Sequence, residues 1–111
     1  MNPITQGAVV IVPFPHSDLS TPKVRPAIVI SNKNLKGDDV LLVGLSSKKG
    51  GTQSIRVSEN DLSKGKLPLT SYAKTGKITY IHKKLIRQVV AYLRPEKLHE
   101  MIASVWSIIK K

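Results

Sequence analysis

The sequence predicts a mainly β protein: a small, strongly curved antiparallel sheet or barrel with one α-helix at its C-terminal end. Short apolar segments alternate with turn-forming residues as far as residue 93, which is typical of successive antiparallel strands. Beyond that point the apolar residues change to the spacing of a helix. The 111 residues are enough to bury a core, so we expect a single domain spanning 1–111, without a linker or an internal repeat.

The first expected strand covers residues 8–12. Gly7 opens it, and Pro13 and Pro15 mark its end, because proline cannot donate to a strand ladder. The segment that follows, as far as residue 22, is rich in proline and small polar side chains. We expect this segment to form an exposed loop.

A second strand begins at Pro26, directly after Arg25, and continues through residues 27–30. A proline at the first position of a strand fixes its own φ angle and keeps the residue before it extended. This arrangement would present the Arg25 guanidinium to a ligand at the end of the sheet. An arginine that simply lies on the surface fits the same pattern, so both interpretations stay open.

Two further strands are expected in the middle of the chain. Residues 39–45 are rich in valine and leucine and lead into Ser46 and Ser47. A loop of lysine and glycine follows at 48–51. The segment 52–57 then alternates polar and apolar side chains, as a half-buried strand does.

The chain is expected to form a short helical turn after residue 57. Ser58 and Asp61 have the spacing of a capping box, and Gly65 is placed to close a single helical turn. A long strand then covers residues 71–81, where Gly76 indicates a bulge or a bend.

The last part of the chain predicts a tight turn at 82–85, a sixth strand at 86–93 and a terminal helix. Pro95 fits the first helical position, where no hydrogen-bond donor is needed. Lys110 and Lys111 lie at the C-terminal end, where positive charge stabilises the helix dipole. The apolar residues at helical spacing are Leu98, Met101, Ile102, Val105 and Ile109.

The chain is strongly basic, with 18 Lys plus Arg against 7 Asp plus Glu and a formal net charge of +11. No acidic residue lies between Asp61 and Glu96. This distribution favours a polyanionic partner, either a nucleic acid or an acidic protein segment. A basic surface that is merely solvated is the alternative. The basic residues of the acid-free segment are Lys64, Lys66, Lys74, Lys77, Lys83, Lys84, Arg87 and Arg94.

Several classes of protein are excluded by the composition. The chain has no cysteine, which rules out disulfides and thiolate metal sites. No apolar run approaches the length of a membrane span, and the N-terminal residues do not resemble a signal peptide. No carboxylate cluster accompanies the histidines, so we expect no metal and no other cofactor. The expected location is cytoplasmic.

Several motifs occur together in a characteristic order. A Pro-Phe-Pro motif at 13–15 is followed by Arg-Pro-Ala at 25–27, by Leu-Ser-Ser at 45–47 and by Ser-Tyr-Ala-Lys at 71–74. In this order, and over nearly the whole chain, the sequence resembles the MazF/PemK-like toxin family of toxin–antitoxin systems. The resemblance implies an SH3-like barrel of the CcdB/MazF type with a C-terminal helix. It also implies a homodimer, metal-independent cleavage of single-stranded RNA, and an antitoxin whose acidic segment fills the RNA groove.

The family's functional residues are carried over one at a time. Its arginine matches Arg25, and the hydroxyl residue at the end of the third strand, commonly a threonine, matches Ser46. Cleavage by the ribose 2′-hydroxyl adds negative charge to the phosphate, which a guanidinium can hold with two parallel hydrogen bonds. A nearby hydroxyl can bond a phosphate oxygen or relay a proton. Apart from the resemblance, Ser46 fits equally a strand-end serine that bonds its own backbone.

Further candidates for RNA binding lie near these two residues in the sequence. His16 is in the loop before Arg25, and Phe14 is the best placed aromatic side chain for stacking on a base. A phenylalanine that fills the core of the barrel fits Phe14 as well. The other residues expected to hold the RNA backbone are Lys23, Ser47, Lys48, Lys49 and Lys74.

The chain departs from some relatives in the fifth expected strand. An Arg-x-Asp triplet proposed to supply acid and base reads here Lys74, Thr75, Gly76. Lysine keeps the positive charge but loses the planar fork, and glycine has no carboxylate. A histidine pair that includes His16 or His82 is another source of acid–base groups. The alternative function is a catalytically weak or silent module that binds RNA or an antitoxin.

A second alternative is a CcdB-like poison of DNA gyrase. CcdB toxins have a similar fold, and they use a tryptophan near the end of the terminal helix to act on gyrase. Trp106 matches that position only loosely. Its place at the edge of the apolar stripe also fits a residue that caps the core or docks on a partner subunit.

Overall fold

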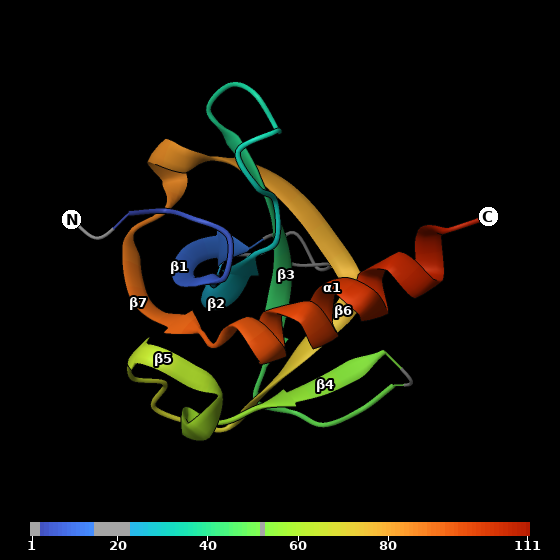
Figure 1. The fold of residues 1–111 in the computed structure, drawn as a ribbon. Coiled ribbons are helices and arrows are strands. Elements are labelled where there is room, and N and C mark those ends of the chain that lie inside the picture. The colour runs from blue at the N-terminus through green and yellow to red at the C-terminus, as the bar shows by residue number, and fades with distance from the viewer. Residues whose placement is uncertain (1–2, 15–22, 52) are drawn as a thin grey trace.

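The computed structural model describes residues 3–14, 23–51 and 53–111, which form a seven-stranded sheet and a C-terminal helix (Figure 1). Two short 3₁₀ turns, Glu59–Asp61 and Lys83–Leu85, connect strands. The helix α1 spans Pro95–Ile109. The strands are β1 (Ala8–Phe14), β2 (Lys23–Val29), β3 (Asp39–Ser46), β4 (Ser54–Val57), β5 (Leu62–Gly65), β6 (Ser71–His82) and β7 (Gln88–Leu93).

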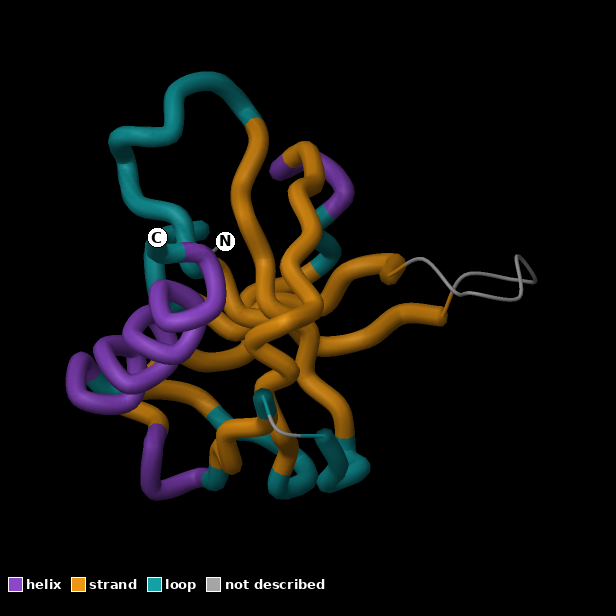
Figure 2. The backbone as a smooth tube through the Cα atoms, turned by 90° about the vertical axis from the view of Figure 1, so that its right-hand side faces the viewer, coloured by secondary structure: helices purple, strands orange, loops and turns teal. Residues whose placement is uncertain are grey.

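The sheet has the order β4-β6-β3-β2-β1-β7-β5, and all neighbouring strands are antiparallel. It curls into a half-barrel, so that its two edge strands, β4 and β5, lie at the same end of the molecule in Figure 1. The paired ends of β1 and β2 project from the rest of the sheet, on the side away from α1 (Figure 2). The predicted class, a mainly β barrel with a C-terminal helix, is therefore confirmed.

Irregular pairing produces the curvature. Val43 pairs with Ile78, whereas Leu45, two residues on, pairs with Ala73. The β6 residues between these partners, 74–77, have no partner on β3, so the strand bends there. This bend contains Gly76, as the sequence predicts. A second irregularity lies where Val9 and Val10 pair with Ala91 and Val89, which leaves Val90 as the extra residue of β7.

The predicted helical turn after Ser58 is correct only in its first part. The Ser58 backbone N–H donates to the Asp61 carboxylate (2.8 Å), as in a capping box, but the turn ends at Asp61. Residues 62–65 form the strand β5, which pairs with β7. Leu62 is buried there, and Gly65 (φ +83°) faces the Val90 carbonyl. A Cβ at this glycine would lie 2.1 Å from that oxygen, so Gly65 permits close strand contact instead of capping a helix.

Two buried clusters lie on the two faces of the sheet. Along β1, Val9 belongs to one cluster, and its neighbours Ala8 and Val10 belong to the other, as the two-residue period of a strand requires. The first cluster includes Met101 and Val105, the buried residues of α1. The central strands are buried on both faces, which explains why their sequences are almost continuously apolar.

The helix α1 is held against β6 by a polar contact as well. The hydroxyls of Thr75 and Ser104 lie 2.7 Å apart, and Thr75 is fully buried. Trp106, by contrast, is 60% exposed, so it does not close the core. No helix among the described residues is long and apolar enough to cross a membrane.

Candidate functional site

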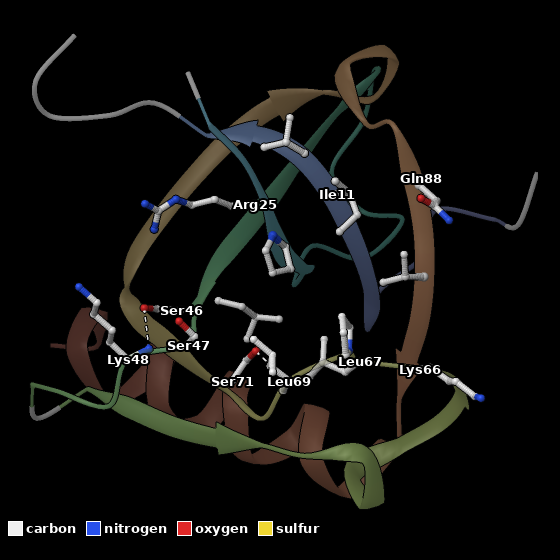
Figure 3. A pocket seen from close by; sticks show the side chains of 15 residues that line it. Ile11, Arg25, Ser46, Ser47, Lys48, Lys66, Leu67, Leu69, Ser71 and Gln88 are labelled. Carbon is white, nitrogen blue, oxygen red and sulfur yellow. Dashed lines mark hydrogen bonds between the residues drawn. The ribbon is translucent and has the colours of Figure 1, made fainter. Parts of the chain in front are cut away.

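A groove of about 700 Å³ opens on the half-barrel between the β3 end and the connection from β5 to β6 (Figure 3). It is lined by side chains from widely separated parts of the sequence, which the curled sheet brings together. The lining residues are Ile11, Val24, Arg25, Pro26, Leu45, Ser46, Ser47, Lys48, Lys66, Leu67, Pro68, Leu69, Ser71, Gln88 and Val90.

Arg25 enters this groove from β2, where it pairs with Val12 of β1. The strand begins at Lys23, before the predicted start, so Arg25 lies within the strand and not at its end. The proline is tolerated because β2 pairs with β3 only from Ala27 onwards, beyond Pro26. Arg25 is only partly exposed.

Ser46 is the last residue of β3 and lines the same groove as Arg25. Its Oγ accepts a hydrogen bond from the Lys48 backbone N–H (3.1 Å), so the contact of a strand-end serine with its own backbone is present. The hydroxyl proton of Ser46 is not used in this bond, because the oxygen is the acceptor. Ser46 therefore keeps a donor for a ligand in the groove.

The groove has two sides that carry polar residues and an apolar floor between them. Arg25, Ser46 and Lys48 lie on one side of it, and Lys66 and Gln88 lie on the other (Figure 3). The exposed Ser47, one of the residues expected to hold the RNA backbone, belongs to the first side. The floor between the two sides is apolar and includes the side chains of Ile11, Pro26, Leu45, Leu67 and Val90.

Lys66 and Gln88 were not among the predicted site residues. The Lys66 backbone N–H donates to the Val90 carbonyl (3.3 Å), and Gly65 turns the chain just before it. Lys66 thus reaches the groove through the pairing of β5 with β7, which the sequence pattern did not predict. The sequence feature that could have indicated Lys66 as a site residue is its place in the acid-free basic segment.

Lys49 and Lys74 are not among the residues that line the groove. Lys49 is exposed in the loop between β3 and β4. The Lys74 ammonium donates to the Gly50 carbonyl (2.7 Å) and to Ser54 Oγ (3.2 Å), and it lies 6.0 Å from the centre of the Tyr72 ring. It borders a second hollow of about 370 Å³, lined by Gly50, Gly51, Gln53, Lys74, Gly76 and Lys77.

Phe14 and Lys23 face each other in the register of β1 and β2, at the end of β1 and the start of β2. Their backbone positions are described, whereas their side chains are not. His16 lies outside the described residues.

The other two histidines do not line the groove. His82 Nδ1 accepts a hydrogen bond from the Lys84 backbone N–H (3.1 Å), and its Nε2 lies 3.9 Å from Asp38 Oδ2. His99 is exposed on α1. Among the described residues, no three or more His, Cys, Asp or Glu side chains form a group that could hold a metal ion.

The charge of the groove follows from where the acidic residues lie. Arg25, Lys48 and Lys66 line it, and no carboxylate belongs to the described lining residues. Asp61 and Glu100 instead lie beside the Lys97 ammonium, at 3.7 and 2.9 Å. A basic groove with an apolar floor can hold a phosphate at its charged side and a flat base on its floor.

Comparison with protein families gives a match over most of the chain. A model of the PemK-like, MazF-like toxin of type II toxin–antitoxin systems matches residues 5–108. No curated protein sequence matches the chain.

Solved structures of similar fold cover nearly all of the chain. An endoribonuclease in complex with its cognate antitoxin from a mycobacterial species has a TM-score of 0.71 at 18% identity, over 96% of this chain and 93% of that chain. A MazE–MazF complex from Deinococcus radiodurans has a TM-score of 0.71 at 16% identity, over 96% and 94%. A MazF toxin of Mycobacterium tuberculosis has a TM-score of 0.69 at 14% identity, over 90% and 93%. Each of these three structures covers at least 90% of this chain.

Proposed function

Because the chain belongs to the PemK-like, MazF-like toxin family of type II toxin–antitoxin systems, we propose that it is an endoribonuclease that cleaves single-stranded RNA. The observation that carries this proposal is the composition of one groove. Arg25, Ser46 and Lys48 line it together, without a carboxylate among its described lining residues. The solved structures of similar fold include endoribonucleases.

The proposed reaction is a transesterification within the RNA. The ribose 2′-oxygen forms a bond to the adjacent phosphorus and loses its proton, while the bond from phosphorus to the 5′-oxygen breaks and that oxygen takes up a proton. The products are a 2′,3′-cyclic phosphate and a 5′-hydroxyl. Extra negative charge develops on the non-bridging oxygens, where Arg25 supplies paired N–H donors and Ser46 supplies one O–H donor. No step requires a metal ion.

In some relatives an Arg-x-Asp triplet is proposed to supply the acid and the base. The matching residues here, 74–76, supply neither group. Gly76 has no side chain, and the Thr75 hydroxyl is buried against Ser104. The Lys74 ammonium is bonded to the Gly50 carbonyl. The proposed catalysis therefore depends on stabilisation of phosphate charge in the groove, supported by positioning of the RNA, rather than on a carboxylate base.

Other residues predicted from the sequence extend the proposed RNA surface. Ser47, Lys48 and Lys49 follow the end of β3 and are exposed, so they are placed to hold the RNA backbone. Phe14, His16 and Lys23 belong to the base of the β1–β2 connection or to the connection itself, and we propose that they contact RNA there. Lys66 is added to this set, because it lines the opposite wall.

The proposed partners follow the same chemistry. A cognate antitoxin would insert an acidic segment into the basic groove, and the similar structures include toxin–antitoxin complexes. We propose that the chain is a single domain that forms a homodimer in the cytoplasm. Trp106 and Ile109, each 60% exposed at the end of α1, are apolar side chains that a second copy could cover. The gyrase alternative lacks support of this kind, because the similar structures include endoribonucleases.

The deciding experiment incubates the purified protein with a long unstructured RNA in excess chelator and maps the new ends. The proposal predicts discrete fragments whose 5′ ends are hydroxyls and whose 3′ ends are cyclic phosphates. Binding without fragmentation would instead identify a silent RNA-binding relative. Fragmentation that stops in chelator would contradict the metal-independent reaction.

A further inference from the structure

The Lys74 side chain makes two hydrogen bonds at the loop between β3 and β4, part of which lines the groove. Its ammonium donates to the Gly50 carbonyl at 2.7 Å and to Ser54 Oγ at 3.2 Å. Gly50 lies in the connection from β3 to β4, and Ser54 is the first residue of β4. One ammonium therefore joins the middle of this loop to its end.

The loop needs such a contact because of its composition. Residues 47–53 include the adjacent pair Gly50 and Gly51, and Gly51 has a φ of +77°. Glycine loses more conformational entropy on ordering than any other residue, so a loop of this kind is not rigid by itself. Ser47 and Lys48, at the start of the same loop, line the groove.

The other contacts of the loop lie on either side of the Lys74 contact. At its start, Ser46 Oγ accepts the Lys48 backbone N–H (3.1 Å). At its end, the Gln53 carbonyl accepts the Thr75 backbone N–H (3.0 Å). The Lys74 ammonium is the described side chain that holds the loop between these two points.

The bend of β6 places Lys74 where it can do this. Lys74 pairs with Ser54 in the ladder of β4 and β6, while residues 74–77 have no partner on β3. The side chain therefore starts from the strand that runs beside β4 and reaches back to the loop. A compact ammonium with three donors suits one carbonyl and one hydroxyl, which a planar guanidinium fork does not match as well.

We propose that Lys74 is a positioning residue, which holds the Gly50 carbonyl so that the loop keeps Ser46, Ser47 and Lys48 in place at the groove. This role replaces direct RNA contact as the role of Lys74, and it rests on the proposed nuclease function. Two of the three N–H donors of Lys74 are already used within the protein. RNA contacts in this region then come from the loop residues themselves.

The test compares Lys74→Met, which keeps the length of the side chain but removes the donors, with Lys77→Met. Lys77 lies on the same strand and borders the same hollow, and it makes no described hydrogen bond to the loop. Both variants lose one positive charge, so a difference between them reports the loop contact. Thermal unfolding of both variants establishes that they fold.

The first measurement is amide hydrogen exchange of residues 47–51 in the protein without RNA. Lys74→Met should raise exchange in this segment by about 10-fold, which corresponds to the net contribution of a hydrogen bond, and Lys77→Met should leave it unchanged. Unchanged exchange in Lys74→Met overturns the proposal. Because no RNA is present, this result does not depend on the nuclease function.

The second measurement separates positioning from RNA contact. Lys74→Met should lower kcat by about 10-fold or more, while the salt dependence of binding to a 2′-O-methyl RNA stays at the wild-type slope. A slope that becomes about 0.7 less steep marks a lost phosphate contact and contradicts the positioning role. Raised exchange with an unchanged kcat also contradicts it. If Lys74→Met raises exchange but the wild-type protein does not cleave RNA, the loop contact is supported and the proposed nuclease function is rejected.

Discussion

At the scale of single residues, the proposed chemistry depends most on Arg25. Its guanidinium lines the groove from β2 and has the paired donors that a phosphate with extra charge requires. Arg25→Ala is expected to lower the cleavage rate by about 100-fold to 1000-fold, the usual effect of removing one donor to a developing oxyanion. Initial rates on a short fluorescent RNA measure this loss.

The matched control for Arg25 is Arg56→Ala, because Arg56 is exposed on β4 and does not line the groove. It should cleave at nearly the wild-type rate. Arg25→Lys keeps the charge without the fork and should fall between the two. If Arg25→Ala cleaves as fast as Arg56→Ala, Arg25 has no part in the reaction.

Ser46 allows a more selective prediction. Ser46→Ala removes both the acceptor for the Lys48 backbone N–H and the donor to the phosphate, so we expect a rate about 10-fold lower. Ser46→Thr keeps the hydroxyl and should retain the wild-type rate within about 2-fold. Single-turnover rates of the two variants distinguish them. Equal rates in Ser46→Ala and Ser46→Thr would remove the hydroxyl from the mechanism.

The site residues that could be predicted from the sequence differ physically from those that could not. Arg25, Ser46 and Lys48 follow from local signals, namely a proline in a strand and the end of an apolar run. Lys66 reaches the groove through the pairing of β5 with β7, and Gln88 reaches it through the pairing of β7 with β1. No local pattern encodes these contacts between distant segments. The Lys74 ammonium donates to the Gly50 carbonyl. This acceptor is a backbone group, so no residue type in the sequence indicates it.

At the scale of the elements, six of the strands and the helix could be predicted, because their apolar residues repeat at strand or helix spacing. The strand β5 could not, because it is short and only its first residue, Leu62, is buried. Its capping-box sequence does form the first turn, and pairing with β7 then overrides the helical tendency.

Gly65 tests whether that pairing holds the barrel together. Gly65→Ala places a Cβ 2.1 Å from the Val90 carbonyl at a φ of +83°. We expect the free energy of unfolding to fall by about 2 kcal/mol or more, from backbone strain and the separation of β5 from β7. Urea unfolding curves measure the loss.

A suitable comparison is Gly37→Ala, whose glycine has a φ of +92° and open space where the Cβ would be. It should cost about 1 kcal/mol, from backbone strain alone. Equal losses in the two variants would show that the approach of β5 to Val90 adds nothing to stability.

At the scale of the whole molecule, the question is whether RNA binds to the net charge or to the groove. The formal charge of +11 is spread over the chain, whereas Arg25, Lys48 and Lys66 are the cations that line the groove. Binding through these three cations and through Lys23 and Lys49 of the proposed RNA surface releases counterions from about five phosphates, so the logarithm of the binding constant should fall with the logarithm of salt concentration with a slope of about −3.5. A general basic surface predicts a clearly steeper slope.

Lys66 sharpens this test because it lies on the wall opposite Arg25 (Figure 3). Lys66→Met should make the slope about 0.7 less steep, since one phosphate contact is lost. Lys64→Met removes the same charge from the exposed strand β5, outside the groove, and should leave the slope unchanged. Titrations of 2′-O-methyl RNA over a range of salt concentrations give both slopes. If the two variants change the slope equally, RNA responds to the overall charge, and the opposite wall of the groove does not contact it.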